Sequence, residues 1–544
     1  MKSTPNTAFE VRQPLILAAV MAVGMFIGQQ LPRYNAHFSY SAGDRQSIKA
    51  SGSLDEVLRF IESKYVDSID TDFLHNQAIE QLLAQLDPHS VYISPEELRA
   101  VQEDMSGNFE GIGVEFLMLE DTIQVVSPLS GGPSETAGIM AGDKIVTIND
   151  TAVAGVGLET GAIYGKLRGP KGTQVRLGVK RGMEAALRQF TVTRDVIPVN
   201  SVDIAYMLDQ NTGYIKINRF TARTHQEFME GLTRLVEQEN MKNVILDLRG
   251  NPGGYLNEAT DMLSQLFPED KLLVYTEGRT EERRDYKSNG RARFDIQHIA
   301  VLVDEGSASA SEIMAGAIQD HDRGWVVGRR TYGKGLVQEQ FPLRNGGALR
   351  LTVARYYTPS GRSIQRTYSS REDYEKDPQQ RLKNGELSGE TSIPVVDSTA
   401  YYTGMGRLVY AHGGIMPDVF VPIDTSYMNP YYLSVRQHLS QFAARWMEDR
   451  PRTDFPENLT AFRRNWTPDE QTLAALVQYA EQEGVPRNDA QLASCKRELQ
   501  LQLKARVAKM LFQNEGQYSV LNDDDPAVEK ALQLLRDGAP LVKR

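Results

Sequence analysis

The strongest structural constraint in this sequence is a strand, a turn and a helix that follow one another directly. An apolar run, Ile299–Val303, ends in the polar turn DEGSAS, and an apolar helical stretch begins after it. Ser307, Ser309 and Ser311 occupy this junction. A serine placed there exposes its hydroxyl beside the unpaired N–H groups of a helix N-terminus. Such serines also serve as ordinary N-caps, so the residues alone leave a nucleophile and a cap as alternatives.

Strands and helices alternate in the same way along residues 195–425. Val244–Leu248 and Ile299–Val303 are continuous apolar runs, which suit strands buried on both faces of a sheet. Further strands are expected at 214–218, 325–328 and 349–357. The pattern predicts an α/β core with a mixed sheet.

The segments on either side of this core have other patterns. Residues 53–97 and 428–544 show the apolar spacing of helices, and residues 98–185 show β-rich alternation with glycine turns. We expect helices to begin at Thr467-Pro468 and Asp525-Pro526, with proline at the first helical position. The chain is therefore expected to be an α+β multidomain protein. The charged segment 366–400 matches no predicted element.

Composition limits the class of protein and its partners. A chain of 544 residues, 41% hydrophobic and 24% charged, suits three or four globular domains. A net charge of −11 argues against nucleic acid as a partner, because phosphate binding needs clustered Lys and Arg. The one cysteine, Cys495, shares helical spacing with Leu492 and Leu499. This spacing predicts a buried thiol rather than a nucleophile.

The N-terminus carries a signal for export. Lys2 and Arg12 precede an apolar run at residues 14–31, close to the ~17–25 residues that a spanning helix needs. No Ala-x-Ala site follows directly, so we expect an uncleaved anchor, with a cleaved signal peptide as the alternative. Residues 1–13 would then be a cytoplasmic tail and residues 32–52 a polar linker to the exported part.

Seven motifs along the chain resemble those of one family. They are LDPHS at 86–90, GIGVEF at 111–116, DLRGNPGG at 247–254, GSASASEI at 306–313, GKGLVQ at 333–338, YYTPSGRSIQ at 356–365 and GGIMPD at 413–418. In this order they resemble the carboxy-terminal processing proteases, also called tail-specific proteases, over roughly residues 50–425. The resemblance implies a serine endopeptidase with a PDZ domain inserted before the protease core. In a bacterium the export signal would place it on the periplasmic side of the inner membrane.

The resemblance implies a Ser–Lys mechanism that forms an acyl-enzyme. Ser309, the middle serine of its turn, would be the nucleophile, and Lys334, between two glycines, would be the general base. An exposed lysine is protonated at neutral pH, so this role requires a pKa lowered by burial. Gln338 lies four residues further on, on the same face in a helix or a strand, and would orient the lysine. His89 is expected to be a structural turn residue.

An oxyanion hole is expected beside the nucleophile. The backbone N–H of Ala310, the residue after Ser309, would provide one donor. The second would come from Gly253 or Gly254 in the NPGG turn, where missing side chains let the backbone approach a substrate. The residues do not distinguish between these two glycines.

The PDZ resemblance implies a site for peptide C-termini. Backbone N–H groups of its loop would capture the terminal carboxylate, and the following strand edge would pair with the peptide. The residues expected to bind peptide are Gly111, Ile112, Gly113, Val114 and Phe116. Arg168, in a turn late in this domain, is a candidate for coupling tail binding to cleavage, with a solvated turn arginine as the alternative.

Two other functions remain open from the sequence. A PDZ adaptor or scaffold with an inactive protease fold would be favoured if Ser309 or Lys334 were replaced, but both are present. A conventional Ser–His–Asp hydrolase would need a base such as His321 or His412, and neither lies in a motif that requires it. We expect protein or peptide substrates with exposed C-termini and no metal or other cofactor. The oligomeric state stays open, a homodimer included.

Overall fold

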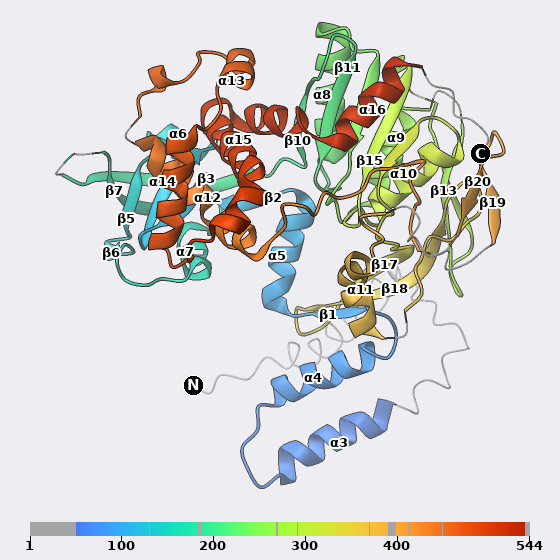
Figure 1. Ribbon diagram of the computed structural model, residues 1–544. Coiled ribbons are helices and arrows are strands. Elements are labelled where there is room, and N and C mark those ends of the chain that lie inside the picture. The colour runs from blue at the N-terminus through green and yellow to red at the C-terminus, as the bar shows by residue number, and fades with distance from the viewer. Residues whose placement is uncertain are drawn as a thin grey trace, which may run out of the picture. The chain divides into compact units, whose positions relative to one another are not determined.

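The computed structural model describes residues 51–538, apart from 130, 183, 185, 268–269, 291, 369, 390–398, 412 and 449 (Figure 1). The predicted anchor at 14–31 and the tail before it lie outside these residues. None of the helices within the described residues is long and apolar enough to span a bilayer. The chain divides into two units, Met1–Ile79 and Glu80–Arg544. In the first, the described residues form α3 (Ser51–Lys64) and the start of α4 (Thr71–Leu83).

A six-stranded sheet forms the centre of the α/β core. Its first strand is antiparallel to its neighbour and all other pairs are parallel, so the prediction of a mixed sheet is confirmed. The strands, in spatial order, are β10 (Val202–Met207), β11 (Thr212–Ile217), β12 (Asn243–Asp247), β15 (His298–Val303), β16 (Trp325–Gly328) and β21 (Val419–Phe420).

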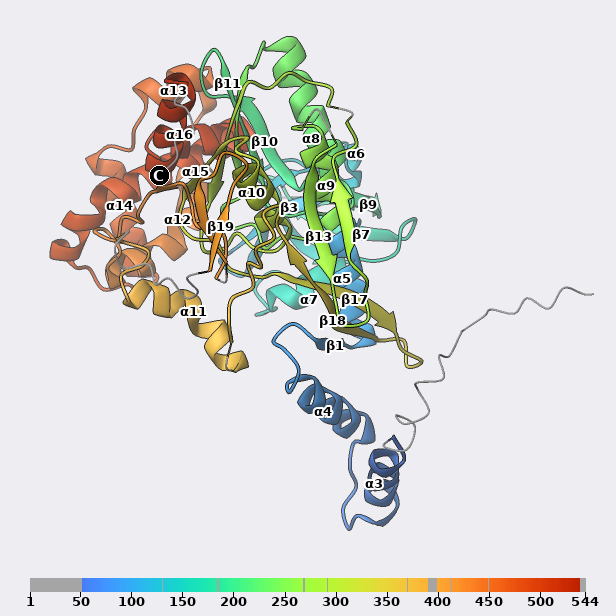
Figure 2. The ribbon, with the colours of Figure 1, turned by 90° about the vertical axis from the view of Figure 1, so that its right-hand side faces the viewer.

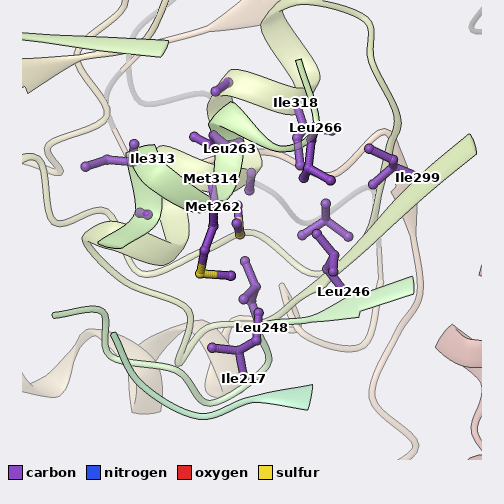
Figure 3. Packing of buried hydrophobic residues seen from close by; sticks show 14 of the residues in the cluster. Ile217, Leu246, Leu248, Met262, Leu263, Leu266, Ile299, Ile313, Met314 and Ile318 are labelled. Carbon is purple, nitrogen blue, oxygen red and sulfur yellow. The ribbon is translucent and has the colours of Figure 1, made fainter. Parts of the chain in front are cut away.

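Helices cover one face of this sheet. They are α8 (Thr224–Thr233), which continues into a π-helical turn (Arg234–Gln238), α9 (Leu256–Ser264) and α10 (Ala310–Asp320). Figure 3 shows Leu246 and Leu248 of the strand region packed with Met262 of α9 and Met314 of α10 in one buried cluster. Because α10 is anchored in this core, the turn that precedes it is held firmly at the sheet edge.

A second, antiparallel sheet lies beside the first. Its strands β13, β17 and β18 run next to one another in Figure 2. β17 pairs with one edge of β18, and β1 and β13 pair with the two ends of the other edge. The strands are β1 (Val91–Ile93), β13 (Leu272–Glu277), β14 (Arg284–Lys287), β17 (Leu336–Pro342) and β18 (Ala348–Tyr357). The unassigned segment after residue 366 contains α11 (Arg371–Lys383) and leads to a small hairpin of β19 (Ala400–Tyr402) and β20 (Leu408–Tyr410).

The predicted PDZ region is a separate small sheet with short helices. A ribbon of β2 (Asn108–Gly111) and β9 (Asp195–Pro198) joins it to the core, directly after α5 (Pro95–Ser106). The sheet extends past the expected boundary at residue 185, because β8 pairs along the whole of β7. Its elements are β3 (Val114–Leu119), β4 (Thr122–Pro128), α6 (Pro133–Ala137), β5 (Lys144–Ile148), β6 (Thr151–Ala152), α7 (Thr160–Leu167), β7 (Gln174–Lys180) and β8 (Arg188–Thr193).

The C-terminal region is helical, and it contacts both of the preceding domains (Figure 1). In α15 the helix is interrupted at Phe512 and Gln513. Before the break, Lys509 forms an ion pair with Glu115 of β3, and after it Tyr518 donates to Asp203 of β10. The helices are α12 (Pro430–Glu448), α13 (Leu459–Asn465), α14 (Glu470–Gln482), α15 (Asp489–Asn522) and α16 (Pro526–Arg536).

Helix α16 packs on the second face of the six-stranded sheet. Val528 and Leu535 of this helix share a buried cluster with Tyr214, Ile245 and Leu302 of the strands. Both faces of the sheet are therefore covered, as the continuous apolar runs in its strands predicted. Cys495 of α15 is fully buried, as its helical spacing predicted. It lies in a different cluster, formed by the C-terminal helices.

Candidate active site

The turn between β15 and α10 holds Ser309 in a strained conformation. Its φ of 55° and ψ of −115° lie where a side chain is unfavourable by ~1–3 kcal/mol. Gly253 packs directly against it, since a Cβ on that glycine would lie 2.7 Å from the Ser309 Cβ. A strained serine on a sharp strand-to-helix turn is the arrangement that presents a nucleophile to substrate.

The predicted catalytic and oxyanion residues line one cavity of about 590 Å³. Part of its wall is apolar, formed by Met105 of α5, Ile313 of α10 and Leu336 of β17. Six residues that the sequence analysis predicted for catalysis or for the oxyanion hole line this cavity together: Gly253, Gly254, Ser309, Ala310, Lys334 and Gln338.

A chain of two hydrogen bonds holds Lys334 within this cavity. Its Nζ donates to Gln338 Oε1 at 3.0 Å, and Gln338 Nε2 donates to the carbonyl of His89 at 2.6 Å. Burial lowers the pKa of Lys334, and the positive charge of Arg350 lowers it further. Both causes favour the neutral amine, which is the form that can accept a proton.

None of the described histidines is placed as a base for Ser309. His89 Nε2 shares a hydrogen bond of 2.9 Å with the Tyr374 hydroxyl, and burial lowers its pKa to about 4. His321 follows α10, where its Nε2 lies 2.6 Å from the Leu272 carbonyl, and it does not line the cavity. His412 lies outside the described residues.

Glu312 is a site residue that the sequence reasoning missed. Its side chain is fully buried, and its carboxylate accepts from the backbone N–H groups of Ser309 at 2.8 Å, Gly333 at 2.7 Å and Lys334 at 2.9 Å. The hydroxyl of Thr331 also donates to it, at 2.5 Å. Burial raises the pKa of Glu312 to about 7. The spacing Ser309-x-x-Glu312 is that of a capping box, a signal that could have identified it.

Tyr356 makes a second bridge between the same two segments. Its buried hydroxyl lies 3.0 Å from the Ser309 carbonyl and 2.5 Å from the Lys334 carbonyl. Glu312 therefore fixes the N–H groups of Ser309 and Lys334, and Tyr356 fixes their carbonyls. The tyrosine belongs to the YYTPSGRSIQ motif at 356–365, to which the family resemblance assigned no role.

The two glycines of the NPGG turn differ in their hydrogen bonds. The Gly253 N–H donates to Asn251 Oδ1 at 2.9 Å. The N–H groups of Gly254 and Ala310 have no acceptor within the described part of the chain. A Cβ at Gly254 would lie 2.0 Å from the Phe220 carbonyl oxygen, so only glycine fits there.

The loop before β3 has the form of a carboxylate site. The Ile112 carbonyl accepts from the N–H and the hydroxyl of Ser134, at 3.0 and 2.6 Å, which fixes the loop. Within the described residues, the backbone N–H groups of Ile112 and Gly113 have no hydrogen-bond acceptor. β3 is an edge strand, and Phe116 on it contacts Tyr164 of α7 with ring centroids 5.3 Å apart. Val114 packs in the same cluster as Phe116.

Arg168 connects this domain to the catalytic cavity. At the end of α7, its Nη1 donates to Glu103 of α5 at 3.1 Å, and its guanidinium lies 4.7 Å from the centre of the Phe109 ring. Three other α5 residues, Val101, Gln102 and Met105, line the catalytic cavity. The Arg168 side chain is also 43% exposed, so it remains in contact with solvent while it makes these contacts.

Three segments of the chain match known families. Residues 211–375 match Peptidase family S41, and residues 111–194 match the PDZ domain. Residues 431–513 match a family of unknown function (DUF8443).

Individual relatives agree with these matches. The chain is 36% identical over 334 residues to the carboxy-terminal-processing protease of Bartonella bacilliformis, covering 59% of this chain and 74% of that protein. It is 32% identical over 324 residues to the carboxy-terminal processing protease CtpB of Bacillus subtilis, covering 59% and 67%. The solved structure of a photosystem II D1 C-terminal processing protease shares 29% identity with a TM-score of 0.34, covering 61% and 92%. This chain therefore belongs to the carboxy-terminal processing proteases, serine peptidases of family S41 that carry a PDZ domain.

Proposed function

We propose that this protein is an exported, membrane-anchored endopeptidase that binds C-terminal tails in its PDZ domain and cleaves with Ser309 and Lys334. One observation carries the proposal. A strained serine and a buried lysine line the same cavity, and Glu312 and Tyr356 tie their backbones together.

In the acylation step, Ser309 Oγ attacks the scissile carbonyl and its proton passes to the neutral amine of Lys334. The resulting tetrahedral intermediate carries a negative oxygen. When it collapses, the C–N bond breaks and Lys334 returns the proton to the leaving amine. Water, deprotonated by the same lysine, then hydrolyses the acyl-enzyme. Gln338 holds the lysine amine in position throughout.

The oxyanion hole in this proposal consists of the N–H groups of Ala310 and Gly254. The Gly253 N–H already donates to Asn251, whereas the other two have no acceptor in the described residues. Gly253 has a spatial role instead, because any side chain there would collide with Ser309 and Ala310. Such donors typically contribute ~3–4 kcal/mol of transition-state stabilisation.

Substitution of the proposed pair tests the mechanism. Ser309→Ala and Lys334→Ala should each lower kcat by about 10⁴-fold or more on a protein with an unstructured tail. Lys334→Arg should be equally inactive, because guanidinium stays protonated at working pH. Circular dichroism and thermal unfolding would check that each variant folds. Full activity of a pure Lys334→Ala sample would refute the mechanism, and tail binding without cleavage by the wild type would identify a scaffold.

Tail recognition has its own support in the loop before β3. The free N–H groups of Ile112 and Gly113 can bind a carboxylate, and Val114 and Phe116 provide apolar contacts for the terminal side chain. Substrates with free, amidated and charged C-termini should be cleaved at different rates, and the free apolar tail should be fastest. Equal cleavage rates for all three substrates would show that the PDZ domain does not recognise the C-terminal residue or its carboxylate.

Membrane attachment rests on residues 14–31, an apolar run behind a basic tail. Full-length protein should fractionate with membranes, and a chain starting near residue 34 should be soluble and active. N-terminal sequencing of the mature protein distinguishes the alternatives. A start between about residues 30 and 45 would establish a cleaved signal peptide.

A further inference from the structure

The catalytic cavity contains an arginine without an acidic partner. Three cationic side chains line it, those of Arg219, Lys334 and Arg350. Arg219 forms an ion pair with Asp104 of α5, and Lys334 donates to Gln338. Among the described residues, no carboxylate forms an ion pair or hydrogen bond with Arg350. Arg350 is partly buried, and without a carboxylate partner among the described residues its guanidinium is available to a ligand.

The sheet register places Arg350 on the face of the hairpin that contacts the catalytic lysine. Arg350 of β18 lies opposite Gln340 of β17, and Thr352 lies opposite Gln338. Side chains alternate along a strand, so Arg350, Gln340 and Gln338 share one face. Glu339, the acidic residue lining this cavity, lies on the other face of β17.

The contacts of Arg350 leave most of its donors free. Its recorded hydrogen bond, from Nη2 to Gln340 Oε1, is long at 3.4 Å. A guanidinium carries five N–H donors in a planar fork that matches a carboxylate. Arg350 is itself partly buried at the wall of this cavity, where an ion pair is stronger than in open water.

We propose that Arg350 forms a specificity subsite that binds a carboxylate of the substrate close to the scissile bond. The inference rests on the proposed function, because it assumes that peptide occupies this cavity during cleavage. The substrate tail is held at the PDZ domain, so the carboxylate would come from an Asp or Glu side chain in the cleaved segment. The alternative source of the same group is the C-terminus of a short peptide.

A positional scan of peptide substrates tests the subsite. One neutral parent peptide is varied to Glu, Gln or Lys at each of the four positions on either side of the cleaved bond, with free and amidated C-termini. At one position, Glu should raise kcat/KM about tenfold over Gln, as expected for one charge-assisted ion pair. Lys at that position should lower it.

Variants of the enzyme assign any preference to Arg350. Arg350→Gln should abolish the preference for Glu, Arg350→Lys should keep part of it, and Arg350→Glu should reverse it toward Lys. Arg355→Gln is the matched control, since it removes the same charge from an exposed position on the same strand outside the cavity. It should leave the preference unchanged.

The outcomes separate the subsite from the proposed function. If the neutral parent is cleaved but neither Glu at any position nor a free C-terminus gives a preference that Arg350→Gln abolishes, the subsite alone is overturned. No cleavage of any peptide by the wild type would instead overturn the proposed function. If Arg350→Gln does not fold, the other two variants test the subsite. A preference for Lys in Arg350→Glu, or a weakened preference for Glu in Arg350→Lys, would support it, and the wild-type preference in both would overturn it. A dependence on the free C-terminus that Arg350→Gln abolishes would support the subsite and assign its carboxylate to the terminus, whereas one that survives Arg350→Gln belongs to the PDZ domain.

Discussion

The backbone N–H groups of Ser309 and Lys334 donate to the same oxygen, Oε2 of Glu312, at 2.8 and 2.9 Å. One buried atom therefore sets the separation of the proposed nucleophile and base. Since burial raises the pKa of Glu312 to about 7, the carboxylate loses part of its negative charge in weakly acidic solution. The alignment of the site and the folding stability of the protein should both depend on this group.

Glu312→Gln should lower kcat more than it changes KM. The amide keeps one acceptor oxygen. Its NH₂ group replaces the second carboxylate oxygen and therefore faces N–H or O–H donors that lose their acceptor. We expect an activity loss of about 10- to 100-fold and a stability loss of about 1–3 kcal/mol from donors left without acceptors. Steady-state kinetics and urea unfolding measure the two effects.

The pH dependence of folding checks the same residue independently. The folded pKa of Glu312, about 7, lies above the ordinary glutamate value of 4.5, so the folded state binds this proton more tightly than the unfolded chain. The contribution of Glu312 to stability is then full below about pH 4.5 and is lost as the pH rises toward about 7. Stability of the wild type minus that of Glu312→Gln should fall across this window. A pH-independent difference would contradict the prediction.

The pH profile of cleavage should follow the charges around Lys334. Burial and Arg350 lower the pKa of this lysine, whereas Glu312 and Asp87 raise it. Removing the cation in Arg350→Gln should therefore raise the pKa, and the rising limb of kcat/KM should move to higher pH by about half a unit or more. Gln338→Glu should move it the same way, because it adds a negative charge at the amine.

A neutral peptide substrate keeps this measurement free of substrate ionisation. Arg355→Gln should leave the limb in place, since that side chain is exposed and outside the cavity. His89, with a pKa of about 4, is neutral over the working range and should contribute no limb near neutral pH. An unshifted limb in Arg350→Gln would remove this residue from the electrostatics of the lysine.

Arg168→Ala should uncouple tail binding from cleavage. The Arg168–Glu103 ion pair joins the end of α7 to α5, and α5 also lines the catalytic cavity. We expect tail affinity, measured by fluorescence anisotropy, to stay the same while the acceleration that a free tail confers on cleavage falls severalfold. Glu103→Ala should behave alike, and a double-mutant cycle should show that the two effects are not additive. Arg176→Ala, which breaks an exposed pair with Asp150 in the same domain, should change neither quantity.

Breaking the buried pair of Arg362 and Asp320 should destabilise the core. Arg362 Nη2 donates to Asp320 Oδ1 at 2.8 Å, with side chains 0% and 1% exposed. Asp320→Asn leaves a buried guanidinium without its counter-charge, so we expect a loss of about 3–5 kcal/mol in urea unfolding. Arg371→Ala, which removes an exposed pair with Glu375, should cost less than about 0.5 kcal/mol. Similar losses for both variants would contradict the argument.

Local sequence patterns predicted the parts of the fold that local forces determine. The apolar runs at 244–248 and 299–303 became β12 and β15 within a residue or two at each end. Asp525 caps α16, which begins at Pro526 as expected. The other predicted start was wrong, because α14 begins at Glu470 with Asp469 as its cap and Pro468 lies outside. Thr467 and Asp469 are both good capping residues, and it is the Asp469 side chain that accepts from the Thr472 N–H.

Contacts between distant segments could not be predicted in this way. The bond from Gln338 to the His89 carbonyl joins residues that are 249 positions apart in the sequence. Helix α11 was missed because it has no apolar stripe. Its buried side chains include Arg381, which pairs with Glu386 and donates to the Thr331 carbonyl. Polar partners of this kind leave no periodicity in the sequence.

Helix α16 has a practical consequence for any shortened form of this enzyme. Its side chains are the cover over Tyr214, Ile245 and Leu302 on the second face of the central sheet. A chain cut after residue 425 would keep every proposed catalytic group and yet turn that apolar surface toward water, where it would favour self-association. The last helix is thus an integral layer of the catalytic domain, although it lies far from the chemistry in both sequence and space.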